Sequence, residues 1–122
     1  MYESGENYLE TILMLKEKHG IVRSIDIART LNFSKPSVSR AVGILKEDGY
    51  ITVETGGEIR LTEKGRNKAE GIYERHKLLT DFLQQVSGVD AVIAEEDACK
   101  MEHILSDETF QGIKRFMRQG KP

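Results

Sequence analysis

The sequence contains no tryptophan, a single cysteine and no long uninterrupted apolar run. One cysteine, Cys99, cannot form an internal disulfide, so the chain suits a reducing compartment. The longest apolar runs, such as residues 12–15, are far shorter than the roughly 18 residues that a membrane-spanning helix needs. Residues 1–6 are acidic and lack the cationic start and apolar stretch of a secretory signal. We therefore expect a cytoplasmic protein without a membrane span.

The 122 residues have the composition of a globular protein, with 31% charged and 39% hydrophobic side chains. The net charge of -2 argues against a chain that binds nucleic acid over its whole surface, but the charges are unevenly distributed. Residues 21–46 hold five basic side chains and one acidic one, whereas residues 81–108 hold eight acidic side chains and one lysine. The first segment suits a polyanion and the second suits cations.

Apolar side chains recur every three or four residues over most of the chain, which predicts a mainly α protein. The first helix is expected over residues 4–19. A second is expected to begin with Ser24 as its cap, and a third with Ser34 as its cap and Pro36 in its first turn. The third helix is expected to end at Asp48. Two helices joined by about four residues form a helix-turn-helix unit.

Two β-branched runs follow, at residues 50–55 and 58–61, on either side of Gly56-Gly57. This pattern predicts a hairpin with a two-residue turn. A helix-turn-helix followed directly by a hairpin is a winged helix. Residues 1–62 are therefore expected to form an N-terminal winged helix-turn-helix domain.

The rest of the chain predicts helices only. Thr62 is expected to cap a long helix with apolar positions at intervals of three and four, and Asp90 and Ser106 are expected to cap two shorter helices. The apolar seam of the long helix suits packing against other helices. Residues 63–122 are therefore expected to form a C-terminal helical domain.

The start of the third predicted helix is polar and basic. In a helix-turn-helix these side chains face base edges in the major groove, while nearby cations on the same helix and on the wing suit phosphates. A merely solvated polar face is the alternative, but the wing directly downstream favours DNA binding. The predicted DNA-binding residues are Lys35, Pro36, Ser37, Ser39, Arg40, Lys46 and Arg60.

A second set of residues suits a metal. Cys99, Glu102 and His103 have the i, i+3, i+4 spacing of one helix face. Thiolate, carboxylate and imidazole together suit a divalent transition metal, whereas calcium and magnesium prefer oxygen ligands alone. Three further side chains on the first and fourth predicted helices could complete the coordination: Asn7, Glu10 and His76.

Taken singly, these residues also suit simpler roles. Cys99 could be a small buried apolar residue, His76 a hydrogen-bonded core histidine, and Glu10 a surface charge. The enzymatic alternative is a Cys99 nucleophile with His103 as its base. Nothing nearby suggests an oxyanion site or a glycine-rich nucleophile turn, so we do not expect an enzyme.

The run Asp97–Glu108 closely resembles the metal-binding helix of the diphtheria toxin repressor family. Four further segments fall at the spacings seen in that family and in its manganese-regulator branch, MntR: Asn7–Glu10, Phe33–Ser39, Leu61–Gly65 and Arg75–Leu79. The resemblance covers nearly the whole chain. The run around Cys99 is specific to the family, whereas the winged helix alone is shared with many repressors.

The resemblance implies a metal-activated transcriptional repressor that binds palindromic operator DNA as a homodimer to control metal homeostasis. Its C-terminal helical domain would bind the metal and dimerise. The implied cofactor is a divalent transition metal, Fe2+ or Mn2+, with Co2+, Zn2+ and Ni2+ as substitutes in vitro. Cys99, Glu102 and His103 match ligands of the iron branch's activating site, and Glu10 and His76 match ligands of the manganese branch's second metal.

Some positions depart from the family pattern. Asn7 stands where the iron branch has methionine and the manganese branch has aspartate. Thr80 and Glu95 replace a glutamate and a histidine of the iron branch's ancillary site, which we therefore expect to be altered. The sequence ends at Pro122, without the SH3-like domain of the longer iron repressors. The alternative function is a winged-helix repressor that responds to a small molecule or to oxidation of Cys99.

Overall fold

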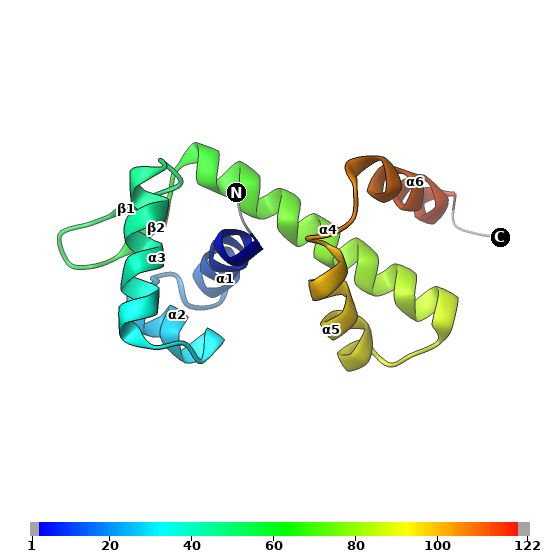
Figure 1. Ribbon diagram of the computed structural model, residues 1–122, viewed down its shortest axis with the longest axis horizontal. Coiled ribbons are helices and arrows are strands. Elements are labelled where there is room, and N and C mark those ends of the chain that lie inside the picture. Colours follow the sequence, from blue (N-terminus) through cyan, green and yellow to red (C-terminus); the bar gives the residue numbers. More distant parts are fainter. Residues whose placement is uncertain (1–2, 120–122) are drawn as a thin grey trace. The chain divides into compact units, whose positions relative to one another are not determined.

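The structure, a computed structural model, describes residues 3–119 and is mainly α-helical, as the sequence predicts (Figure 1). It divides into two compact units, the first ending at Gly71 and the second beginning at Ile72. The elements over the described residues are α1 (Glu3–His19), α2 (Ser24–Leu31), α3 (Lys35–Glu47), β1 (Ile51–Val53), β2 (Ile59–Leu61), α4 (Glu63–Ser87), α5 (Ala91–Met101) and α6 (Asp107–Arg118). None of the helices in residues 3–119 is long and apolar enough to cross a membrane.

The first unit has one apolar core beneath α1, α2, α3 and the hairpin. The three- and four-residue spacing of apolar side chains in α1 directs Leu9 and Ile12 into that core, where both are fully buried. The other elements, and the segment between α1 and α2, contribute β-branched side chains to the same core: Val22, Ile27, Val38, Ile51 and Ile59. The expected winged helix-turn-helix is therefore confirmed as a packed unit.

The turn between α2 and α3 contains a left-handed residue, Asn32, and the predicted cap Ser34. Asn32 adopts a left-handed conformation (φ 57°), and the Ser34 side chain accepts the backbone N–H of Ser37 at 3.3 Å. The predicted cap of α2 is wrong by one residue. Arg23 is the N-cap, and its backbone N–H is bound by the Asp26 carboxylate at 2.8 Å.

The wing differs from its expected form. Strands β1 and β2 pair antiparallel, with Val53 opposite Ile59, and residues 54–58 join them. A two-residue hairpin turn needs positive φ either at both central residues (type I′) or at the first of them (type II′). Here Gly57 alone of the pair has positive φ (89°), and its N–H bonds to the Glu54 carbonyl at 2.8 Å, so the turn spans more residues.

The start of α4 is hydrogen-bonded to the residues that follow α3. The Thr62 N–H donates to the Tyr50 carbonyl at 3.0 Å, and Lys64 donates to the Asp48 carbonyl at 2.9 Å. The Thr62 hydroxyl also caps α4 by accepting the Gly65 N–H at 3.0 Å, as predicted. A Cβ atom at Gly65 would lie 1.9 Å from the Tyr50 carbonyl oxygen, so this position requires glycine.

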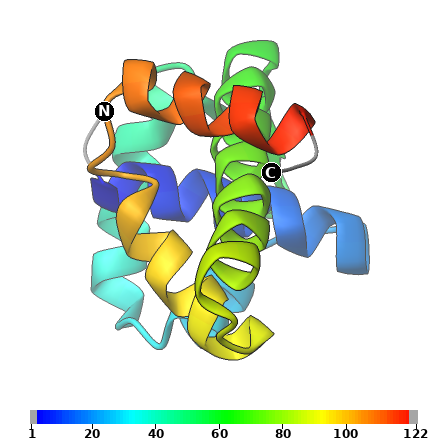
Figure 2. The same cartoon turned by 90° about the vertical axis from the view of Figure 1, so that its right-hand side faces the viewer.

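The second unit is built from α5, α6 and the part of α4 that follows Gly71 (Figure 2). One buried side chain from each helix forms its core: Leu79, Ala98 and Phe110. Asp90 and Ser106 cap α5 and α6 by accepting the N–H groups of Ile93 and Thr109, as predicted. The first turns of α5 and α6 are therefore both stabilised by side-chain caps.

We expect Gly65→Ala to destabilise the first unit by about 1–3 kcal/mol, because the added methyl must displace the Tyr50 backbone. Gly71→Ala is the matched control on the same helix. Its Cβ would meet no atom within 4 Å, so the better helix former should stabilise by up to about 1 kcal/mol. Urea unfolding followed by circular dichroism measures both. Equal effects of the two substitutions would contradict the close approach at Gly65.

Candidate functional site

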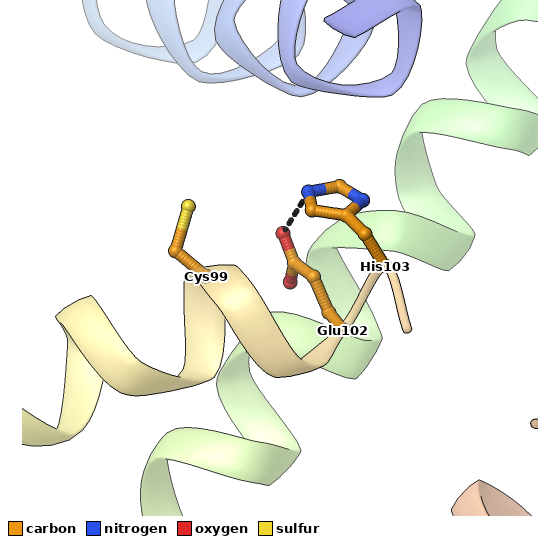
Figure 3. Close-up of side chains that lie close together, drawn as sticks. All are labelled: Cys99, Glu102 and His103. Atoms are coloured by element: carbon orange, nitrogen blue, oxygen red, sulfur yellow. Dashed lines mark ion pairs between the residues drawn. The ribbon is translucent and has the colours of Figure 1, made fainter. Parts of the chain in front are cut away.

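Three side chains from the end of α5 lie close together in the second unit (Figure 3). One potential ligand atom from each of Cys99, Glu102 and His103 lies within 4.8 Å of the others. The Glu102 Oε1 atom is 3.3 Å from His103 Nε2, and each of these two side chains is 1% exposed. The sequence-predicted cluster is therefore brought together in a site that is largely closed to solvent.

The backbone that carries this cluster is not entirely the predicted helix. Cys99 lies in α5, which ends at Met101, and His103 lies in the turn that follows. Glu102 keeps helical dihedral angles (φ -61°, ψ -23°), and its N–H bonds to the Ala98 carbonyl at 2.9 Å. The expected helix face therefore holds as far as Glu102, and the turn places His103 beside it.

His76 on α4 faces the same carboxylate. Its Nδ1 atom is 3.4 Å from Glu102 Oε2, and its Nε2 atom is 4.0 Å from Glu95 Oε2. The Thr80 hydroxyl donates to the His76 backbone carbonyl at 2.8 Å. Glu102 thus lies between two imidazoles, one from α4 and one from the turn after α5.

The environment of the buried Glu102 carboxylate indicates whether these residues suit a metal ion. Neither of its carboxylate oxygens accepts a hydrogen bond from any residue in the range 3–119. A buried carboxylate without donors is costly unless a cation compensates it. Two imidazoles, a thiol and this carboxylate are donors that divalent transition metals accept together. The residues of the site therefore fit such an ion.

The two other predicted ligands lie in the first unit. Asn7 and Glu10 are one turn apart on α1, where Asn7 is half-buried and Glu10 is 6% exposed. Their part in metal binding stays a prediction.

The predicted DNA-binding residues are all exposed. Five lie in the first two turns of α3, Lys46 lies in its last turn, and Arg60 lies on β2. The opposite face of α3 buries Val38, Val42 and Leu45 in the core, so the helix is held with its polar face outward. This arrangement leaves the cations of α3 available to a polyanion.

Two hydrogen-bonded contacts modify this surface. The Ser34 hydroxyl donates to the Ser37 hydroxyl at 2.9 Å, so Ser37 already serves the cap of α3. Arg60 donates to the Glu58 carboxylate at 3.3 Å, which offsets part of the positive charge on the wing. Beside the start of α3, burial raises the pKa of the Tyr8 phenol further above neutral pH, where a phenol is already uncharged.

A residue that the sequence did not single out contacts the loop carrying the cluster. Arg75, one position before His76, donates to the Leu105 carbonyl at 3.1 Å. Arg75 belongs to the family-like segment Arg75–Leu79 and is adjacent to a predicted ligand, but neither signal predicts this contact, because it depends on how α4 packs against the loop.

A winged helix in a chain that also carries a buried cluster of residues able to hold a metal ion is the combination expected of a metal-responsive transcriptional regulator. Residues 1–57 match the model of the iron-dependent repressor N-terminal DNA-binding domain, and residues 62–121 match that of the iron-dependent repressor metal-binding and dimerisation domain. The chain belongs to the iron-dependent repressor family. This confirms the family resemblance found in the sequence.

Three similar proteins support this assignment. An uncharacterised HTH-type transcriptional regulator of Methanocaldococcus jannaschii is 38% identical over 122 residues, which cover 99% of this chain and 98% of that protein. The diphtheria toxin repressor of Corynebacterium diphtheriae is 29% identical over 97% of this chain and 52% of its own length. The structure of the manganese regulator SloR matches with a TM-score of 0.83 and 28% identity, covering 93% of this chain and 53% of that one. The chain therefore spans about half the length of the last two.

We expect Glu102→Gln to weaken Co2+ binding by at least about tenfold, because it removes the one charged carboxylate that contacts both imidazoles. The metal-free protein should still fold cooperatively, since glutamine nearly matches the shape of the side chain that it replaces. Competition with a fluorescent chelator and thermal melting in EDTA measure the two effects. The control, Glu96→Gln, changes an exposed carboxylate on α5 and should alter neither. Parental Co2+ affinity in Glu102→Gln would contradict the assignment.

Proposed function

We propose that this protein is a metal-activated transcriptional repressor that binds palindromic operator DNA as a homodimer and so controls metal homeostasis. The observation that carries the proposal is the buried Glu102 carboxylate, which faces two imidazoles and accepts no hydrogen bond from the described residues. The proposed repressor acts in the cytoplasm, where its DNA lies. Its proposed domains are residues 1–62 for DNA binding and residues 63–122 for metal binding and dimerisation.

The proposed ligands come from both units of the protein. Cys99, Glu102, His103 and His76 would bind from the second unit, and Asn7 and Glu10 would complete the coordination from α1. Because a bound ion would then link the units, it would favour the orientation of the winged helix that binds DNA. A ligand shifts such an equilibrium only by binding one state more tightly than the other.

The proposed activating ion is Fe2+ or Mn2+, with Co2+, Zn2+ and Ni2+ as substitutes in vitro. The family description supports iron, and the name of the similar regulator SloR supports manganese. The Cys99 thiolate is a soft ligand that favours Fe2+ or Co2+ over Mn2+. Glu10 and His76 form the pair that the resemblance associates with the manganese branch.

Dimerisation is supported by apolar side chains that the second unit leaves in solvent. They lie on α5, on α6 and near the end of α4: Val86, Val92, Ile93 and Phe116, which are 41–66% exposed. Exposed apolar residues that gather on one small unit indicate an interaction surface. A two-fold dimer would place its two α3 helices on inverted half-sites about one helical turn apart.

A repressor that responds to a small molecule is the second candidate. A cavity of about 590 Å³ in the first unit favours it, with lining residues that include Tyr8, Ala41, Ile44 and Asp48. This volume lies in the range of small-molecule sites. The two functions differ in whether a metal ion alone raises the affinity for DNA.

We expect Mn2+, Fe2+ or Co2+ to tighten specific DNA binding by at least about tenfold, whereas Mg2+ at the same free concentration does not, because the thiolate and imidazoles are poor ligands for a hard ion. The DNA is a duplex selected by the metal-loaded protein from a random library. Fluorescence anisotropy in EDTA and in each ion measures the affinity. The same affinity in EDTA and in all four ions would refute metal activation.

We expect Arg40→Ala to weaken binding to the selected duplex by about 1–3 kcal/mol if Arg40 contacts guanine, or to reduce the salt slope by about one if it contacts phosphate. Metal affinity should stay unchanged. Arg118→Ala, which removes an exposed cation from α6, is the control and should preserve DNA binding. If Arg40→Ala and Arg118→Ala bind DNA equally well, α3 is not the recognition helix.

A further inference from the structure

Arg75 on α4 contacts the loop that carries Glu102 and His103 and also contacts α6. Its Nη2 atom donates to the Leu105 carbonyl at 3.1 Å, and its Cζ atom lies 4.8 Å from the centre of the Phe110 ring. Leu105 belongs to the loop after α5, and Phe110 lies in the first turns of α6. One side chain of α4 therefore contacts both the loop and the helix that follows it.

The loop that Arg75 contacts is the segment that positions the ligands. Glu102 and His103 follow the last residue of α5, and the N–H groups of Ile104 and Leu105 both bond to the Met101 carbonyl at 3.1 Å. These backbone bonds attach the loop to α5 alone. The bond from Arg75 attaches it to α4, which also carries His76.

Packing against Phe110 does not by itself explain an arginine at position 75. Its Nε atom is buried and has no hydrogen-bond partner among residues 3–119. A buried donor without a partner opposes folding, and a methionine could cover the Phe110 ring without burying one. What the arginine has and a methionine lacks is a rigid set of N–H donors, one of which reaches the Leu105 carbonyl.

We propose that Arg75 is a positioning residue of the metal site. It holds the turn bearing Glu102 and His103 against α4, so that Glu102 keeps its distance from His76 while His103 stays beside Glu102. Arg75 itself is not a ligand, and it acts through the backbone of the loop. This inference rests on the proposed metal-binding function. Residues that orient metal ligands typically change metal affinity when they are replaced, even though they do not touch the ion.

The test compares four proteins of 122 residues: the parent, Arg75→Met, Arg75→Gln and Lys77→Met. Lys77→Met is the matched control, because Lys77 also flanks His76 and its Nζ lies 4.5 Å from the centre of the Tyr73 ring. It removes one charge and one cation–π contact from the same helix without touching the loop. Chelator competition measures Co2+ affinity, visible absorption reports the ligand geometry around Co2+, and melting in EDTA reports the stability of the metal-free fold.

Both Arg75 variants should bind Co2+ about tenfold or more weakly, with a changed visible spectrum and a metal-free melting temperature no lower than that of the parent. Lys77→Met should match the parent in affinity and spectrum. A stable Arg75 variant with parental affinity would overturn the positioning role, and so would a lower metal-free melting temperature in both variants. Absence of Co2+ binding by the parent would instead refute the proposed metal-binding function.

Discussion

The burial of a carboxylate between two imidazoles is the constraint on which the second unit depends. Glu102 is 1% exposed and faces His76 and His103 at 3.3–3.4 Å. A polar group held in this way opposes folding unless a charge of opposite sign compensates it, so the packing of Leu79, Ala98 and Phe110 must hold it in place. The same unfavourable burial that a structural protein would avoid is what makes the carboxylate a good ligand for a cation.

The two units divide the chain's charges between two kinds of partner. Three of the five cations of residues 21–46 lie on α3, whose opposite face is buried in the apolar core through Val38 and Val42. The acidic residues of 81–108 lie in the unit that carries the candidate metal-binding residues Cys99, Glu102 and His103. A chain with nearly balanced net charge can therefore suit both a polyanion and a divalent cation, because each field acts within a short range in salt.

The helix ends show which features can be predicted from neighbouring residues in the sequence. Ser34, Asp90 and Ser106 cap their helices as expected, because a cap depends on a side chain and N–H groups within three residues. The same rules misplaced the cap of α2, where the Asp26 carboxylate binds the N–H of Arg23 instead. They also predicted too short a turn in the wing, because a glycine pair permits several turns and the dihedral angle of Gly56 decides among them.

The sequence by itself determined the mainly α class, the winged helix and the residue types of the candidate site, because periodicity, caps and ligand spacing are properties of neighbouring residues. The tertiary structure decided that Glu102 is buried without hydrogen-bond donors and that His76 of α4 faces it. It also decided that Arg75 reaches the loop at Leu105. These features arise between helices distant in the chain, and their distances depend on how side chains of all three helices fill one core, which no local spacing specifies.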